Sequence, residues 1–176
     1  MKYLCLLSLF MLVLTSCYHD PKHIELADQQ MSQFAKEVKK SDNLTLVGSG
    51  GGFLRGISKF SFTFFSPMPA DIDSARRLYI DVSTRFLNRI NDCEEIRCYL
   101  YDYPVTIHNL DLLIIFQPIV KKNTPNYVDS ITMGENASDC KTHHLYYGQY
   151  DEVKDKSTIF FEESYLKAIE IIQQQP

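Results

Sequence analysis

Several features that often indicate function are scarce or missing in this sequence. The chain has no tryptophan, and its 18 lysines and arginines are outnumbered by 22 aspartates and glutamates, which gives a formal net charge of −4. A nucleic-acid surface needs basic side chains gathered in a patch or stripe, and the mild acidity of this chain argues against one. After residue 14, no apolar run is long enough for a membrane-spanning helix, which takes about 20 residues. We therefore expect no nucleic-acid partner and no membrane span in the body of the chain.

Glycine is also scarce, and five of the seven glycines lie in one stretch, GSGGGFLRG at positions 48–56. A phosphate-binding loop of the Walker type ends in Gly-Lys-Ser/Thr, but here Gly52 is followed by Phe53. A dinucleotide fingerprint would need its third glycine at position 53 or 55, and both kinds of loop open a helix. The alternating residues 57–65 predict a strand instead. We therefore expect a hairpin turn or a glycine bulge, with a partner or the N-terminal helix approaching the bare backbone.

The N-terminus is the most informative segment. Lys2 precedes an apolar run over residues 4–14 that only Ser8 interrupts. This run has the length of a signal-peptide core and is too short for a bilayer span. It leads into LTSC at positions 14–17, an aliphatic residue, two small residues and a cysteine. This motif resembles the lipobox of bacterial lipoproteins.

The resemblance divides the chain into three parts. It implies that residues 1–16 are a lipoprotein signal peptide, that 17–23 are a lipidated tether and that 24–176 form a single globular domain. Acyl chains on Cys17 would then attach the protein to the lipid bilayer. Because Tyr18 replaces the aspartate that usually retains lipoproteins at the inner membrane, we expect the cell envelope, with the outer membrane favoured over the inner membrane.

The remaining cysteines can be considered one by one. One of the five lies in the expected signal peptide and Cys17 carries lipid, which leaves Cys93, Cys98 and Cys140 in an oxidising compartment. One disulfide and one free thiol is the simplest expectation, and the sequence does not fix the pairing. Zinc is the alternative, because Cys140 and His143 have ligand-like spacing, but an exported protein favours the disulfide. We expect neither a metal nor a cofactor.

No catalytic motif is present, and we assign no catalytic residue. A thiol nucleophile would need a histidine to accept its proton. The candidates are Cys98 or Cys140 with His108, His143 or His144. No nucleophile elbow or HExxH motif supports such a pairing, and His108 with Asp111 is typical of a polar turn. Adjacent carboxylates at 94–95 and 162–163 do not face each other, so we expect a solvated turn and a solvated helix start.

The hydrophobic pattern predicts the class of fold. Apolar residues spaced three and four apart predict helices at 24–40, at 71–91 and at 162–173. Strands are expected at 44–47, 57–65, 97–103, 110–116, 127–133, 143–150 and 157–161. Helices at both ends and one inside, with strands between them linked mostly as hairpins, indicate an α+β fold. We expect an antiparallel sheet with about three helices packed mainly on one face.

One set of aromatic residues is a candidate binding surface. Tyr99, Tyr101 and Tyr103 alternate along the expected strand 97–103 and would share one face. Such stripes stack sugars or contact partner proteins, although an outer strand can also carry a tyrosine face without that role. The segment 75–106 also resembles uncharacterised lipoproteins of intracellular bacteria, which implies a small globular lipoprotein and assigns no functional residue.

Together these patterns predict a membrane-anchored envelope lipoprotein. Its domain would be a non-enzymatic binding module for another envelope component or for a host protein. The alternative is a periplasmic or surface thiol-dependent hydrolase that uses Cys98 or Cys140 with a histidine.

Overall fold

The computed structural model describes residues 22–117, 127–136, 139–151 and 155–174. The expected signal peptide and Cys17 lie outside these residues. In chain order the elements are helix α2 (Lys22–Ser41), strands β1 (Thr45–Gly52), β2 (Lys59–Ser66) and β3 (Ala70–Asp71), helices α3 (Ile72–Asp92) and α4 (Glu94–Arg97), the 3-10 helix η2 (Ile107–Asn109), strands β4 (Leu110–Phe116), β5 (Tyr127–Val128), β6 (Ser130–Asn136), β7 (Asp139–Asp151) and β8 (Lys156–Ser164), and helix α5 (Tyr165–Gln173).

The main sheet has six strands in the order β1-β2-β4-β6-β7-β8, and β3 pairs separately with β5. Neighbouring strands are antiparallel except β2 and β4, which are parallel. The chain returns through α3 between these two strands, which is the long connection that a parallel pair requires. The predicted α+β class is confirmed, and so is the hairpin of β6 and β7. One parallel pair makes the sheet mixed rather than wholly antiparallel.

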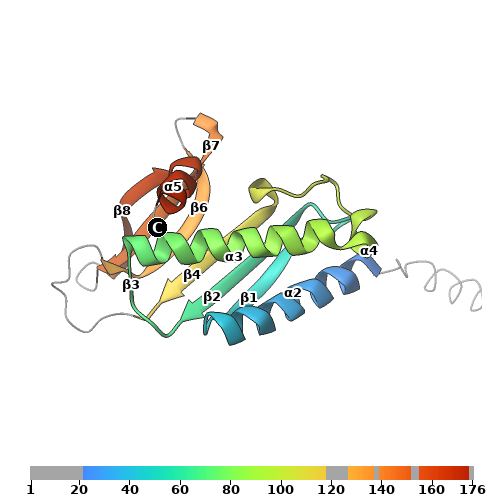
Figure 1. Ribbon diagram of the computed structural model, residues 1–176, viewed down its shortest axis with the longest axis horizontal. Helices are drawn as coiled ribbons and strands as arrows, with labels where there is room; N and C mark the ends of the chain where they lie inside the picture. Colours follow the sequence, from blue (N-terminus) through green and yellow to red (C-terminus); the bar gives the residue numbers. More distant parts are fainter. Residues whose placement is uncertain (1–21, 118–126, 137–138, 152–154, 175–176) are drawn as a thin grey trace, which may run out of the picture.

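The long helices pack on one face of this sheet, as predicted. Figure 1 shows α2 and α3 side by side across the sheet, with α5 next to α3 over the β7 and β8 side. The alternation of β2 turns Phe60, Phe62 and Phe64 toward the helices, and all three are buried. Phe86 of α3 lies 4.8 Å from Phe62 and 5.1 Å from Phe34 of α2 between ring centroids. This aromatic cluster joins both helices to the sheet.

Helix α3 forms because its sequence supplies both a cap and an apolar face. The Asp71 carboxylate accepts a hydrogen bond from the Ser74 backbone N–H at 2.8 Å, and this bond lowers the pKa of Asp71. The buried positions recur at helical spacing, at Ala75, Tyr79, Val82, Phe86 and Ile90 among others. The helix predicted at 71–91 is confirmed.

Helix α2 begins slightly earlier than the sequence predicts. Lys22 and His23, which were expected in the tether, belong to the helix. His23 is buried, and its Nε2 lies 2.7 Å from the carbonyl oxygen of Phe53. The start of α2 is therefore fixed to the loop that follows β1.

Two local predictions are wrong. Residues 97–103 do not form a strand, because after α4 the chain turns and makes only an isolated bridge from Leu100 to Ile57. The glycine run is not the turn between β1 and β2, because positions 48–52 belong to β1 itself, but the alternative prediction of a bulge fits the shift in register between Leu46 and Gly48. Residues 53–58 connect the two strands.

Candidate functional site

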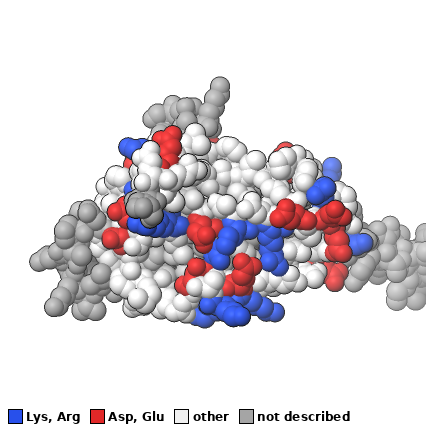
Figure 2. Space-filling view, in the orientation of Figure 1, with Lys and Arg blue, Asp and Glu red and all other residues white. Residues whose placement is uncertain are grey.

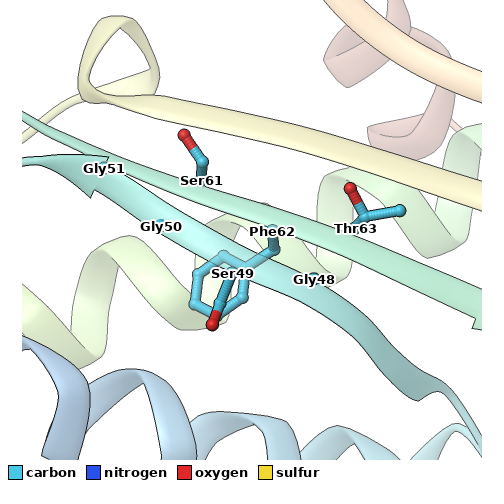
Figure 3. Close-up of a pocket in the computed structure, with 7 residues that line it drawn as sticks. All are labelled: Gly48, Ser49, Gly50, Gly51, Ser61, Phe62 and Thr63. Carbon is cyan, nitrogen blue, oxygen red and sulfur yellow. The ribbon is translucent and has the colours of Figure 1, made fainter.

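The glycine-rich segment forms most of β1, which is an edge strand of the sheet. Gly48 stands opposite Thr63 of β2 and Gly50 stands opposite Ser61, so these four residues share one face. A hollow of about 370 Å³ lies over the two strands, lined by Gly48, Ser49, Gly50, Gly51, Ser61, Phe62 and Thr63. Figure 3 shows Ser61 and Thr63 pointing to one side of the sheet and the Phe62 ring to the other.

The glycines of β1 differ in what surrounds them. A Cβ added at Gly51 would lie 2.1 Å from the Lys59 carbonyl oxygen, and one at Gly52 would lie 2.3 Å from Ser58 Oγ. At Gly50 nothing lies within 4 Å of such a Cβ, and at Gly48 the nearest atom is an ordinary neighbour at 3.9 Å. Packing within the chain therefore requires glycine at 51, where the neighbour is backbone, but not at 48 and 50, and at 52 a rotation of the Ser58 side chain makes room for a Cβ. The space beside Gly48 and Gly50 is unused by the described residues.

The outer side of β1 is also unguarded. β1 pairs with β2 on one side, and its other side is the edge of the sheet, where no other described strand pairs with its backbone N–H and C=O groups. Proteins commonly protect such edges with lysine, proline or bulges. A bulge between Leu46 and Gly48 bends the start of the strand, but residues 48–52 keep a regular register and include neither charge nor proline. Among the residues that the structure describes, no strand occupies the outer side of this half of β1.

The structure does not place the three predicted tyrosines on one face. Tyr99 is partly buried, and its ring stacks on His23 with 6.1 Å between centroids. Tyr101 and Tyr103 are exposed, and the Arg97 guanidinium lies 4.6 Å from the centre of the Tyr103 ring. Two of the three tyrosines therefore remain available as a surface, on a turn rather than on a strand.

The cysteines are placed as follows. Cys93 and Cys98 flank α4 and are both free, so they are not bonded to each other. Gln30 Nε2 donates to Cys93 Sγ at 3.5 Å, and Cys98 Sγ donates to the Glu95 carbonyl at 3.9 Å. Cys140 belongs to β7, but its side chain lies outside the described part of the chain. A disulfide that involves Cys140 stays a prediction.

Two of the predicted histidines meet. His108 Nδ1 of η2 lies 3.2 Å from His143 Nε2 of β7, and the rings stand nearly perpendicular, with 4.1 Å between centroids. Burial, and then the proximity of His108, lower the pKa of His143. Neither free thiol is hydrogen-bonded to a histidine in the described residues. Within the same residues, no group of three or more His, Cys, Asp or Glu side chains is arranged to hold a metal ion.

A buried charged cluster was missed by the sequence analysis. Glu163, which was expected at a solvated helix start, is only 5% exposed because β8 continues through it to Ser164. Arg76 Nε donates to Glu163 Oε1 at 2.6 Å, and the Tyr147 hydroxyl donates to the same oxygen. Arg76 also pairs with Asp73. The cluster joins α3 to β7 and β8, and its main partners are 87 residues apart in the chain.

In the part of the chain that the structure describes, no helix is both long enough and apolar enough to cross a membrane. Comparison of the sequence with models of protein families and with curated proteins, and of the structure with solved structures, finds no significant match.

Proposed function

We propose that this chain is an envelope lipoprotein, attached to the bilayer through acylated Cys17, whose domain binds a protein partner rather than catalysing a reaction. The lipobox-like LTSC motif supports the anchor and an envelope location, with the outer membrane favoured. The observation that carries the binding role is the unguarded half of β1 beside a hollow that no side chain of the described residues fills.

The shape of this site fits an extended peptide segment of an envelope or host protein. A strand added at the edge of β1 would satisfy its outward backbone groups, which is the mode of β-augmentation. Because Gly48 and Gly50 have no side chains, this face of β1 has room for the side chains of an added strand. Ser61 and Thr63 offer hydroxyl groups on the same face. The seven described residues that line the hollow carry no charge, so we expect an uncharged segment.

The substitution Gly50→Val tests the binding role. Its side chain fills the hollow without meeting an atom at the Cβ position, and valine favours strands, so the thermal unfolding midpoint should not fall. Peptides selected from a random display library against the mature chain are the probe. We expect Gly50→Val to abolish their binding, and we expect bound peptide to protect the amides of residues 45–52 from hydrogen exchange.

The matched control is Ser157→Val, a valine at an exposed position of β8 on the opposite edge of the sheet. It should leave peptide binding unchanged. A library that yields no binder, or binders that tolerate Gly50→Val or protect another segment, would overturn the binding role.

The anchor is tested separately. Cys17→Ser should abolish incorporation of labelled palmitate in a bacterial host, because no other residue of the motif offers a thiol for the lipid. Palmitate labelling that persists in this variant would contradict the anchor while leaving the peptide test untouched.

A further inference from the structure

One end of the domain carries exposed apolar side chains close together. Leu54, in the loop between β1 and β2, is 87% exposed, and Tyr101 and Tyr103 are 59% and 50% exposed. A Cβ at Gly56 would meet the Tyr101 ring at 3.3 Å, so the ring lies against the same loop. Backbone hydrogen bonds join Ile57 to the tyrosine segment, from Ile57 N to the Tyr99 carbonyl and from Tyr101 N to the Ile57 carbonyl.

The chain enters the domain at this same end. His23, in the first turn of α2, bonds to the Phe53 carbonyl and stacks on Tyr99. Figure 1 shows the start of α2 at the end of the molecule where α4 and the β1–β2 loop also lie. Only five residue steps separate Cys17 from Lys22, and an extended chain of that length spans at most about 18 Å.

We propose that Leu54, Tyr101 and Tyr103 form a membrane-facing end that rests on the surface of the bilayer and sets the orientation of the domain. The inference rests on the proposed acylation of Cys17. A short tether keeps this end within reach of the lipid, and tyrosine rings settle at the headgroup level with their hydroxyl groups in water. Leu54 is the most exposed large apolar residue among those described.

The charges at this end select the kind of lipid surface. Arg55 and Arg97 are exposed there, but so are Glu94, Glu95 and Asp102. Figure 2 shows blue and red atoms side by side at the end of the molecule that carries α4. A mixed surface gains little from an anionic membrane, whose attraction depends on clustered lysine and arginine. The contact is therefore apolar and aromatic, and it fits a zwitterionic phosphatidylcholine surface.

The tether makes a weak contact sufficient. One leucine and two tyrosines would not hold a free domain on a membrane, but the anchor supplies a high local concentration of lipid. The lipid anchor keeps the domain on the membrane, and the contact of Leu54, Tyr101 and Tyr103 determines only its orientation there. A domain held by the tether alone would stay near the bilayer at this end without inserting Leu54 into the apolar interface.

The absence of tryptophan from the chain gives a direct test, because one substitution introduces a unique fluorophore. Leu54→Trp and Met68→Trp are made in the full-length, lipidated protein and reconstituted on phosphatidylcholine vesicles. Met68 is also a large apolar residue, 63% exposed, but it follows the other end of β2, about 27 Å away along the strand. Both substitutions lie at exposed positions where the fold tolerates a larger side chain.

We expect both variants to sediment with the vesicles. On phosphatidylcholine vesicles the emission of Leu54→Trp should shift to the blue because the indole enters an apolar environment, and brominated phosphatidylcholine should quench it, while the emission of Met68→Trp stays as it is in buffer. Bound protein with neither tryptophan quenched, or with both quenched equally, would overturn the membrane-facing end and leave the anchor intact. Protein that stays in the supernatant would overturn the anchor and the inference together.

Discussion

The two ends of helix α3 carry arginines in opposite surroundings. Near its start, Arg76 is 5% exposed and is bonded to the equally buried Glu163. Toward its other end, Arg85 and Arg89 remain partly exposed and pair with Asp42 and Glu37, which follow or belong to α2. The same residue type thus joins α3 to the sheet at one end and to a neighbouring helix at the other.

The difference lies in what each pair would leave behind if it were broken. Burial by itself lowers the pKa of Arg76, but the hydrogen bond to Glu163 and the further interactions with Tyr147, Glu163 and Asp73 together more than offset it, so the pKa lies above its ordinary value. Removing one partner of a buried ion pair is strongly destabilising because the remaining charge is shielded from water. Exposed ion pairs contribute only about 0–1 kcal/mol to the free energy of unfolding. We therefore expect the cluster of Arg76, Tyr147 and Glu163 to matter more for stability than the surface pairs between α2 and α3.

The largest effect is expected for Glu163→Gln. The amide keeps an acceptor for Arg76 Nε but removes the charge that compensates the guanidinium. Because Asp73 still pairs with Arg76, we expect a loss near the lower bound for a buried pair, about 3 kcal/mol of unfolding free energy. Urea unfolding followed by circular dichroism measures it.

The control for this substitution removes both charges. Arg76→Met combined with Glu163→Leu should be less destabilising than Glu163→Gln alone, because no unpaired charge remains in the interior. A loss of under about 1 kcal/mol for Glu163→Gln would place the buried pair in the same class as the surface pairs and remove the contrast.

An intermediate effect is expected from Tyr147 at alkaline pH. Burial, and then its hydrogen bond to Glu163, raise the pKa of Tyr147 above the usual value near 10. The folded state keeps a proton that the unfolded chain releases. The contribution of Tyr147 to the free energy of unfolding is therefore fully present below about pH 10 and is lost as the pH rises further.

The check is the pH dependence of unfolding free energy for the wild type and Tyr147→Phe. At neutral pH the variant loses one hydrogen bond, about 1 kcal/mol. Above about pH 10 its stability should fall less steeply than that of the wild type. Tyr79 and Tyr165 also have raised pKa values, so some slope remains. Parallel curves for the two proteins would show that Tyr147 does not cause the alkaline loss.

Much of the fold was predictable because burial imposes a local period on the sequence. The alternation of Phe60, Phe62 and Phe64 predicted β2, and the helical spacing along α3 predicted its buried face. The same rule failed at 97–103. Tyr-x-Tyr-x-Tyr alternates like a strand, but a strand needs a neighbour to pair with, and here only Leu100 finds one, in the isolated bridge to Ile57.

The candidate site was less predictable because its features depend on distant residues. The sequence showed that glycines cluster, but only the structure separates Gly51, whose Cβ would collide with the Lys59 carbonyl, from Gly50, which has free space. Glu163 was expected at a helix start, because the adjacent carboxylates of Glu162 and Glu163 do not face each other. The arginine that makes its burial possible lies 87 residues earlier, beyond the reach of any local pattern.

The smallest effect is expected for Asp42→Asn at the other end of α3. Arg85 keeps the carboxylate of Glu37 nearby and the hydroxyl of Ser41, so we expect a loss of about 0.5 kcal/mol. In about 1 M salt, where the screening length falls to about 3 Å, this loss should disappear. The loss caused by Glu163→Gln should persist in the same salt, because ions do not enter the interior. Asp28→Asn, at an exposed position of α2 for which the described residues include no ion pair, is the control and should change stability at neither salt concentration. If the two losses respond to salt alike, the arginines at the two ends of α3 do not differ in the way that their burial indicates.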